Sequence, residues 1–355
     1  MFARSNSNPI LKPNTKNEWE SFKVYNPGAF YEDGVYHLFY RAMGKNWISS
    51  IGHAVSGDGE NFERSKSPLL ASPHNSYSIE DPRVTKIKDK YFLTFTRYDK
   101  LNVTLNLATS TDLKNWNVHG EMIPSWDFKK ASGFLVDWDP AQVEAEKNLE
   151  ASHKWCKAGG IFGEIIGDKY WMLFGDRHIW LANSDDGITW NPIWEPFIKA
   201  RGKNYFDEEH IEMGPPPIKT SKGWLVLYHG VNDKIVYRLG FMLLDLNDPT
   251  KILYRSKDAI FEPQESYELK GIVDILPGGS KAMEKMNTEE LAEFIQRYEE
   301  KDKMPRVAFV NGAVLVGDTL RIYYGASDSV ICTATANISA ILKLHKVKTK
   351  KTLFF

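Results

Sequence analysis

The 355-residue sequence repeats one layout five times along its length. In each unit a short strand-like run passes through a turn of Gly, Asp or Lys into a second run that is rich in aromatic residues. The units begin with "VYNPGAF" (24–30), "IEDPRVT" (79–85), "KAGGIF" (157–162), "GPPPIK" (214–219) and "VAFVNGAV" (307–314). The follow-on pieces "SGDGENF", "STDLKNW" and "SDDGITW" place Ser and Asp in a turn before an aromatic residue, which is typical of an outer hairpin.

Each unit therefore supplies about four antiparallel strands. Radial repetition of four-stranded sheets gives a β-propeller, so the sequence predicts an all-β fold in which residues 1–355 form one five-bladed propeller domain. A pair of β-sandwiches is the alternative, although no linker divides the chain.

One stretch departs from the strand pattern. In "MNTEELAEFIQRYEEKDK", about 286–303, apolar and aromatic residues fall at helical spacing: Leu291, Phe294, Ile295 and Tyr298. We expect a short helical insertion between the fourth and fifth blades, either packed on the scaffold, at the rim of the active site or in an oligomer contact.

Charge and cysteine content narrow the classes of partner. The net charge is −1, from 45 basic and 46 acidic residues, so the chain lacks the basic excess that nucleic acid binding requires. The sequence has two cysteines, Cys156 and Cys332, which imply no disulfide framework. Because no run approaches 18 apolar residues and the N-terminal stretch lacks an apolar signal segment, we expect a soluble cytoplasmic protein with no membrane partner. Homo-oligomerisation stays open.

The first strand of each propeller blade lies nearest the axis, so residues around these strands are predicted to line a central pocket. The predicted wall consists of Asn26, Arg41, Glu80, Asp81, Arg83, Lys157, Glu212, Tyr228, His229, Tyr324 and Asp328. Carboxylates, cations and aromatic rings that converge on a concavity suit a sugar ligand. The alternative for the "EDPR" run is a surface turn with a local ion pair.

Six motifs in order, between about residues 20 and 340, resemble glycoside hydrolase family 130. They are "VYNPGAF…LFYRA", "IEDPR", "KAGGIF…GDKYWML", "GPPPIKTSKGWLVLYHGV", "LLDLNDPTKILYR" and "LRIYYGASD". The resemblance implies a five-bladed propeller that cleaves β-mannosides, such as β-mannooligosaccharides, with inversion, by hydrolysis or by phosphorolysis.

The resemblance also implies residue roles. Asp81 would be the general acid, whose proton in the family's phosphorylases reaches the glycosidic oxygen through the 3-hydroxyl of the mannosyl unit. Arg41 and Asp328 would hold that mannosyl unit. A general acid needs a raised pKa, which the neighbouring Glu80 favours and Arg83 opposes.

The motifs give mixed indications about the nucleophile, which is either phosphate or water. Lys157, Arg177 and His229 stand near positions that bind phosphate in the phosphorylases, although "FGDRHIW" departs from the family's "HR" pattern at Arg177.

Other positions point to water. Ser50 and the pair Leu105 and Asn106 stand near places where phosphorylases carry arginine. Glu212 occupies a place where hydrolytic members carry glutamate and would be the base; its alternative is an ion pair with Lys157 or Arg83. Glu268 is a second acidic candidate. These features slightly favour an inverting hydrolase over a phosphorylase that releases mannose 1-phosphate.

A non-catalytic sugar-binding propeller is a further alternative, which would not need Asp81. We expect no cofactor beyond inorganic phosphate as co-substrate of a phosphorylase. We expect no metal either, since the histidines are scattered without a ligand motif. The β-1,2 or β-1,4 linkage and the accepted chain length stay open.

Overall fold

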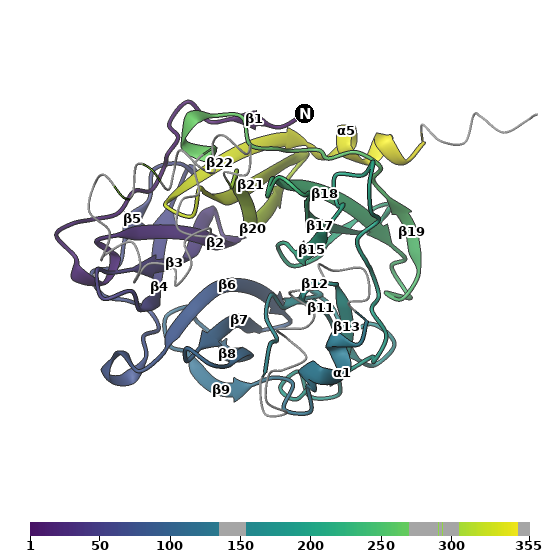
Figure 1. Cartoon of the computed structure of the whole chain (residues 1–355), viewed down its shortest axis with the longest axis horizontal. Helices are drawn as coiled ribbons and strands as arrows, with labels where there is room; N and C mark the ends of the chain where they lie inside the picture. The colour runs from purple at the N-terminus through teal and green to yellow at the C-terminus, as the bar shows by residue number, and fades with distance from the viewer. Residues whose placement is uncertain (135–153, 270–289, 291–292, 294–304, 347–355) are drawn as a thin grey trace, which may run out of the picture.

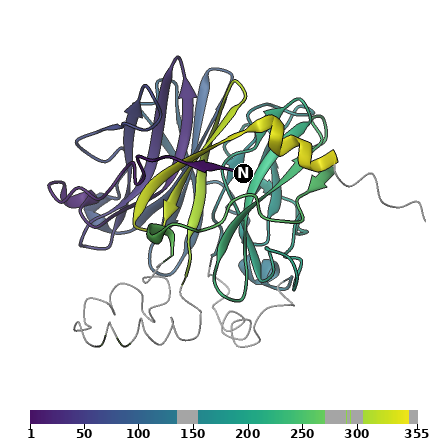
Figure 2. The ribbon, with the colours of Figure 1, turned by 90° about the horizontal axis from the view of Figure 1, so that it is seen from above.

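Five antiparallel sheets surround one axis in the computed structural model, which describes residues 1–134, 154–269, 290, 293 and 305–346 (Figure 1). The five-bladed propeller is thus confirmed, and the alternative of two β-sandwiches is wrong. Seen from above, the strands of neighbouring sheets stand side by side (Figure 2). The predicted helical insertion at about 286–303 lies outside the described residues, except for 290 and 293.

The elements follow the repeat. Blade 1 has β2 (Lys23–Glu32), β3 (Val35–Met43), β4 (Ser49–Ser56) and β5 (Glu63–Arg64). Blade 2 has β6 (Ser78–Ile87), β7 (Lys90–Tyr98), β8 (Val103–Ser110) and β9 (Asn117–Glu121). Blade 3 has β10 (Gly160–Ile161), β11 (Tyr170–Phe174), β13 (Trp180–Ser184) and β14 (Asn191–Pro192). Blade 4 has β12 (Asp176–Arg177), β15 (His210–Met213), β16 (Ile218–Thr220), β17 (Gly223–Val231), β18 (Tyr237–Leu244) and β19 (Ile252–Arg255).

The fifth blade is closed by the start of the chain. Blade 5 has β20 (Ala308–Val316), β21 (Thr319–Ala326), β22 (Val330–Asn337) and β1 (Ala3–Arg4). Strand β1 pairs antiparallel with β22, with Ala3 opposite Thr335. The two ends of the described chain therefore share one sheet, which fastens the ring.

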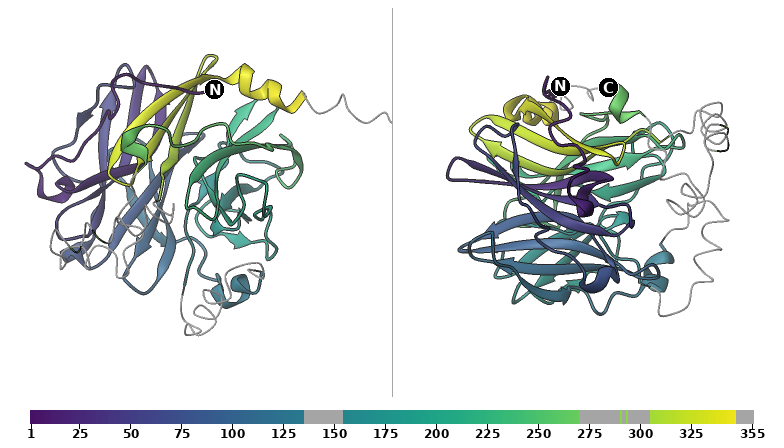
Figure 3. Two further views of the ribbon diagram at one scale, coloured as in Figure 1. Left: turned by 45° about the horizontal axis from the view of Figure 1, so that its top comes forward. Right: turned by 90° about the vertical axis from the view of Figure 1, so that its left-hand side faces the viewer.

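Short helices join or flank the blades. They are η1 (Glu18–Glu20), η2 (Pro73–Asn75), α1 (Phe128–Ser132), η3 (Ser266–Glu268), α5 (Ile338–Lys343) and η5 (Leu344–Lys346). Helix α5 begins where the Asn337 side chain accepts a hydrogen bond from the backbone N–H of Ala340. Beyond β22 it runs along the rim of the ring (Figure 3), and His345 contacts Tyr254 of β19. In the part of the chain that the structure describes, no helix is long and apolar enough to cross a membrane.

The core is divided among the blade interfaces. Since successive strand residues point to opposite faces, each blade packs on both of its neighbours. In β3, Leu38 and Tyr40 join a buried cluster with blade 5, whereas Phe39 joins a cluster with blade 2. The other three interfaces have clusters of the same kind. These five clusters, from apolar residues that alternate along each strand, hold the ring together.

Bulges interrupt the inner strands where these come closest to the axis. The register shifts between Tyr25 and Gly28 in β2, and between Glu80 and Arg83 in β6. A Cβ on Gly28 would meet the carbonyl oxygen of Pro82 at 2.5 Å, so only glycine allows the two strands to approach this closely. The bulges turn selected side chains toward the centre of the ring.

Candidate active site

A pocket of about 370 Å³ lies at the axis, within the size range of small-ligand sites. All five blades contribute to its wall. The residues that line this central pocket are Lys23, Tyr25, Asn26, Arg41, Met43, Trp47, Ser78, Glu80, Asp81, Tyr98, Lys157, Glu212, Tyr237, Val307, Phe309 and Asp328. Seven of the predicted wall residues thus meet in one cavity: Asn26, Arg41, Glu80, Asp81, Lys157, Glu212 and Asp328.

Asp81 sits in the bulge of β6 with a left-handed backbone, φ 51°. A non-glycine residue in this region is strained, and such strain often accompanies a functional site. The Nδ2 group of Asn26 donates to Asp81 Oδ1 at 2.9 Å, and Asn26 itself has φ 44°. Two matching bulges on neighbouring blades therefore hold the carboxylate in place.

Arg41 of β3 joins both neighbouring carboxylates. Its Nη2 group lies 2.7 Å from Glu80 Oε1, and its Nη1 group lies 3.4 Å from Asp81 Oδ1. Its Nε group donates to Ser49 Oγ at 2.9 Å, which fixes the guanidinium. The ring of Tyr25 lies 4.7 Å from the guanidinium carbon. The alternative of a surface turn is therefore wrong for this run, because Asp81 and Arg83 are buried and Arg41 of the neighbouring blade pairs with Glu80 and Asp81.

The two carboxyls of this pair differ in proton affinity. Burial raises the pKa of Glu80, and the Asp81 charge adds to this effect against the opposing Arg41. Burial also opposes ionisation of Asp81, but Arg41, Lys157 and the Asn26 amide outweigh it and lower the pKa of Asp81. The pair thus binds a proton preferentially on Glu80 in the ligand-free protein, and a proton on Asp81 requires a change in these contacts.

Lys157 and Glu212 form an ion pair in the central pocket, with 3.1 Å between Nζ and Oε1. Burial disfavours the Lys157 charge, but Glu212, Asp176 and Asp81 together raise the pKa of this lysine, so it stays cationic. Burial raises the pKa of Glu212, as do Asp176 and Asp81, whereas Lys157 and Arg83 oppose the shift. Lys157 is therefore a cation that lies next to a carboxyl which holds its proton more tightly than usual.

Arg83 does not line the central pocket, contrary to the prediction. It is only 2% exposed and points into the ring, where three backbone carbonyls accept its hydrogen bonds. Nη1 donates to Asp81 at 3.1 Å, Nη2 to Met213 at 2.8 Å and Nε to Gly214 at 2.7 Å. Arg83 thus ties the bulge of blade 2 to β15 of blade 4 behind the pocket.

Asn311 makes a second tie of this kind. Its Nδ2 group donates to the carbonyl oxygens of Asn26 at 3.1 Å and Pro82 at 2.7 Å. Blades 1, 2 and 5 are thereby joined at the axis. The position of Asp81 is therefore set by buried contacts between blades.

Two of the predicted residues on β17 are also buried away from the central pocket. His229 accepts a hydrogen bond from the backbone N–H of Val310 and stacks on Phe309. Burial and the nearby Arg83 lower the pKa of His229 to about 3, so the ring is neutral and is not placed to hold an anion. Tyr228 donates to Asp207 between blades 3 and 4.

Glu268 and Tyr324 form a separate cluster at the closing strand. Tyr324 donates to Glu268 Oε1 at 2.7 Å, and Arg4 of β1 bonds both oxygens of the same carboxylate at 2.8 Å. Neither residue lines the central pocket, since this network fastens β1 to the ring. Ser50, Leu105 and Asn106 are likewise buried and absent from the pocket lining.

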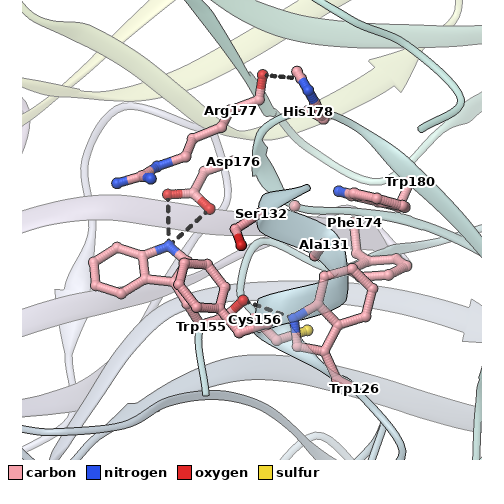
Figure 4. Close-up of a pocket in the computed structure, with 12 residues that line it drawn as sticks. Trp126, Ala131, Ser132, Trp155, Cys156, Phe174, Asp176, Arg177, His178 and Trp180 are labelled. Atoms are coloured by element: carbon pink, nitrogen blue, oxygen red, sulfur yellow. Dashed lines mark hydrogen bonds between the residues drawn. The ribbon is translucent and has the colours of Figure 1, made fainter. Parts of the chain in front are cut away.

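A second, smaller cavity lies next to the central pocket (Figure 4). Arg177 lines it, with Trp126, Trp155, Asp176 and Trp180 among the other lining residues. Asp176 is 3.6 Å from Lys157 and therefore stands in the wall between the two cavities. The sequence analysis missed Asp176, because a two-residue strand gives no pattern from which to place it.

Sequence and structure comparisons agree on the family. A family model for glycoside hydrolase family 130, described as β-1,4-mannooligosaccharide phosphorylase, matches residues 3–288. The chain belongs to glycoside hydrolase family 130. It is an enzyme that acts on β-mannosides, and the pocket at the axis is its candidate active site.

Individual family members align over nearly the whole chain. A β-1,2-mannobiose phosphorylase of Thermoanaerobacter sp. (strain X514) is 33% identical, over 98% of both chains. A 1,2-β-oligomannan phosphorylase of the same organism is 32% identical, over 95% of this chain and 98% of the relative. A solved structure aligns with TM-score 0.72 and 26% identity over 96% of this chain and 94% of the other. The description of that structure says that this family of mannoside phosphorylases contains glycoside hydrolases that target β-1,2 mannosidic linkages in Candida mannan.

Proposed function

We propose that this family 130 enzyme cleaves β-1,2-mannosides by phosphorolysis, with Asp81 as the general acid. The observation that carries the proposal is that Asp81 and the cationic Lys157 line one pocket of about 370 Å³. The two phosphorylases that align over nearly the full length, at 32–33% identity, both act on β-1,2 linkages by name, which supports the same linkage here. The sequence motifs had slightly favoured hydrolysis, and these relatives weigh against that preference.

The pocket contains groups suited to a mannosyl unit. Asn26, Arg41, Glu80 and Asp328 offer donors and acceptors for hydroxyls, and the Tyr25 ring offers an apolar face. Inorganic phosphate attacks the anomeric carbon from the face opposite the leaving oxygen, while the bond to that oxygen breaks. Asp81 supplies the proton that the leaving oxygen takes up, directly or through the 3-hydroxyl of the mannosyl unit. The products are the shortened sugar and α-mannose 1-phosphate, with the configuration inverted.

Lys157 is the cation we assign to phosphate. It remains charged in the pocket, and a point-charge ammonium is a common phosphate ligand. Phosphate would compete with Glu212 for this lysine, and a protonated Glu212 would ease that competition. The raised pKa of Glu212 therefore supports a role for Lys157 in anion binding.

Hydrolysis is the second candidate, and one observation favours it. Glu212 lines the same pocket as Asp81, so a water molecule between them could be activated by Glu212 as the base. In this alternative Lys157 would hold Glu212 in its ionised form rather than bind phosphate.

Product analysis separates the two candidates. The enzyme is incubated with β-1,2-mannobiose, with and without 10-fold excess phosphate over substrate, and products are followed by ³¹P and ¹H nuclear magnetic resonance. Phosphorolysis predicts mannose 1-phosphate and mannose in equal amounts, and no cleavage when phosphate is omitted. Release of two mannose units at the same rate with and without phosphate would instead establish hydrolysis.

A further inference from the structure

Lys157 lies between two carboxylates, not one. Its Nζ atom is 3.1 Å from Oε1 of Glu212 and 3.6 Å from Oδ2 of Asp176. Asp176 and Glu212 are direct partners in the register of β12 and β15. Side chains opposite each other in an antiparallel pair lie on one face of the sheet with Cβ atoms about 5 Å apart. Two carboxyl groups are therefore held close together, and one lysine bridges them.

Asp176 is fixed from its other side by Trp155. The indole Nε1 group donates to both carboxylate oxygens at 3.0 Å, as the dashed lines in Figure 4 show. The backbone carbonyl of Trp155 in turn accepts a hydrogen bond from Trp126 at 2.8 Å. A carboxylate held in this way keeps a fixed distance from Lys157. Burial opposes ionisation of Asp176, but Lys157, Arg177 and the Trp155 hydrogen bond outweigh this effect and lower the pKa of Asp176. The negative charge of Asp176 is therefore stabilised.

We propose that Asp176 is a positioning residue of the reaction, which holds Lys157 in place and sets a fixed negative charge directly across the strand pair from Glu212. The inference rests on the proposed function only in taking the central pocket as the place of reaction. It applies to either nucleophile, because both candidates assign a role to Lys157 or Glu212.

Charged groups on several of the described elements act on the Asp176–Glu212 pair. Glu212 is faced by Lys157 ahead of β10, by Asp176 on β12, and by Arg83 and Asp81 on β6. Asp176 is faced in addition by Arg177 on its own strand and by His210 on β15. Burial lowers the pKa of His210 to about 4, so this ring is neutral near pH 7 and adds no charge there. Among these groups Asp176 is the carboxylate that lies directly across the strand pair from Glu212.

The test is the pH dependence of total mannoside cleavage in D176N. Asparagine has the shape of aspartate and still accepts a hydrogen bond from Trp155, so the fold is retained while the charge is lost. The limb of the profile that Glu212 controls should move to lower pH by about one unit, which changes the rate about tenfold at a pH on that limb. D176E restores the charge and should return the limb toward its original position. D185N is the matched control, since Asp185 pairs with Lys169 on the exposed side of blade 3 and should leave the profile unchanged.

The limb that moves also identifies the nucleophile. In hydrolysis Glu212 must be ionised, so the acid limb moves to lower pH. In phosphorolysis an ionised Glu212 opposes phosphate, so the basic limb of kcat/KM for phosphate moves to lower pH. A D176N profile that superimposes on the wild-type profile, or that moves to higher pH, would overturn the inference while leaving the proposed function intact.

A second measurement does not depend on activity. Thermal unfolding is followed between pH 4 and 9 for D176N, for E212Q and for the double variant. If the two carboxyls interact as proposed, the effect of D176N on the pH dependence of Tm should disappear in the E212Q background. Effects that add at every pH would contradict the inference even if the wild-type protein cleaved no mannoside.

Discussion

Asn26 and Asp81 occupy equivalent bulges in the inner strands of two neighbouring blades, and the amide of Asn26 donates to the carboxylate of Asp81 over 2.9 Å. Both residues have left-handed backbones, with φ of 44° and 51°. The contact crosses the interface between blades 1 and 2, so the position of the proposed acid depends on the closure of the ring. It also stabilises the ionised form of Asp81.

N26G tests this contact. Glycine adopts the left-handed backbone without strain, and the substitution removes the side-chain amide that donates to Asp81. Loss of a hydrogen bond to the ionised carboxylate should raise the pKa of Asp81, so the basic limb of kcat/KM for mannobiose should move to higher pH by about one unit. The measurement is the pH profile at saturating phosphate. A limb that stays in place would show that Asn26 does not act on the proton of Asp81.

E80Q should move the basic limb of the pH profile in the opposite direction. Glutamine keeps an acceptor for Arg41 but removes the like charge next to Asp81. Without that charge the pKa of Asp81 falls further, and because the acid must be protonated, the basic limb should move to lower pH. The profile is measured under the same conditions as for N26G. A shift of both variants in one direction would contradict the assignment of that limb to Asp81.

R83M tests the buried tie behind the pocket. Methionine has a similar length but leaves the carbonyls of Asp81, Met213 and Gly214 without their donors, so we expect a loss of about 3 kcal/mol or more in the free energy of unfolding. Chemical denaturation is the measurement. The control is R97M, because Arg97 is exposed and lies over the Tyr77 ring; it should lose less than about 1 kcal/mol. Similar losses for the two variants would show that the buried tie is not important for stability.

R4M tests the closing strand. Arg4 bonds both oxygens of the buried Glu268, so its removal leaves a buried carboxylate without its cationic partner and should cost about 3–5 kcal/mol at pH 7. Burial opposes ionisation of Glu268, but Arg4, backbone N–H groups and Tyr324 lower its pKa. A lowered pKa means that this stability is present above the unfolded pKa and is lost as the pH falls through the folded value.

The difference between R4M and wild type should therefore shrink in acid, which thermal unfolding at pH 7 and pH 3 can measure. R238M is the control, since Arg238 pairs with a half-exposed Glu262 and should lose less than about 1 kcal/mol. A loss for R4M that is the same at both pH values would contradict the role of the Glu268 charge.

The repeat in the sequence was enough to predict the propeller, because each unit carries its own turn and strand signals. It also placed Asn26, Asp81 and Glu212 of the inner strands in the central pocket, although Arg83 of β6 lies behind that pocket. The same reasoning failed for two residues of blade 4. Tyr228 and His229 lie on β17, whose side chains fill the interfaces between blades instead of facing the axis.

The pairing of two other strands could not be predicted from the local sequence. Strand β1 is two residues long and pairs with a strand more than 300 positions later in the chain, so only the closed ring shows that it binds Glu268 through Arg4. Strand β12 is also two residues long. It lies between two strands of blade 3 in the sequence but pairs with β15 of blade 4. This crossing brings Asp176 next to Lys157, at a point where the sequence alone indicates only a departure from the family's pattern.

The most direct test of Asp81 as the proton donor compares two leaving groups in D81N. Asparagine cannot donate the proton, so cleavage of β-1,2-mannobiose should fall by about 10²–10⁴-fold, while the affinity of the protein for mannobiose is retained. A 2,4-dinitrophenyl β-mannoside releases 2,4-dinitrophenolate, a stable anion that needs no proton, so its cleavage by D81N should stay within a few-fold of wild type. An equal loss on both substrates, or full activity of D81N on mannobiose, would contradict the assignment.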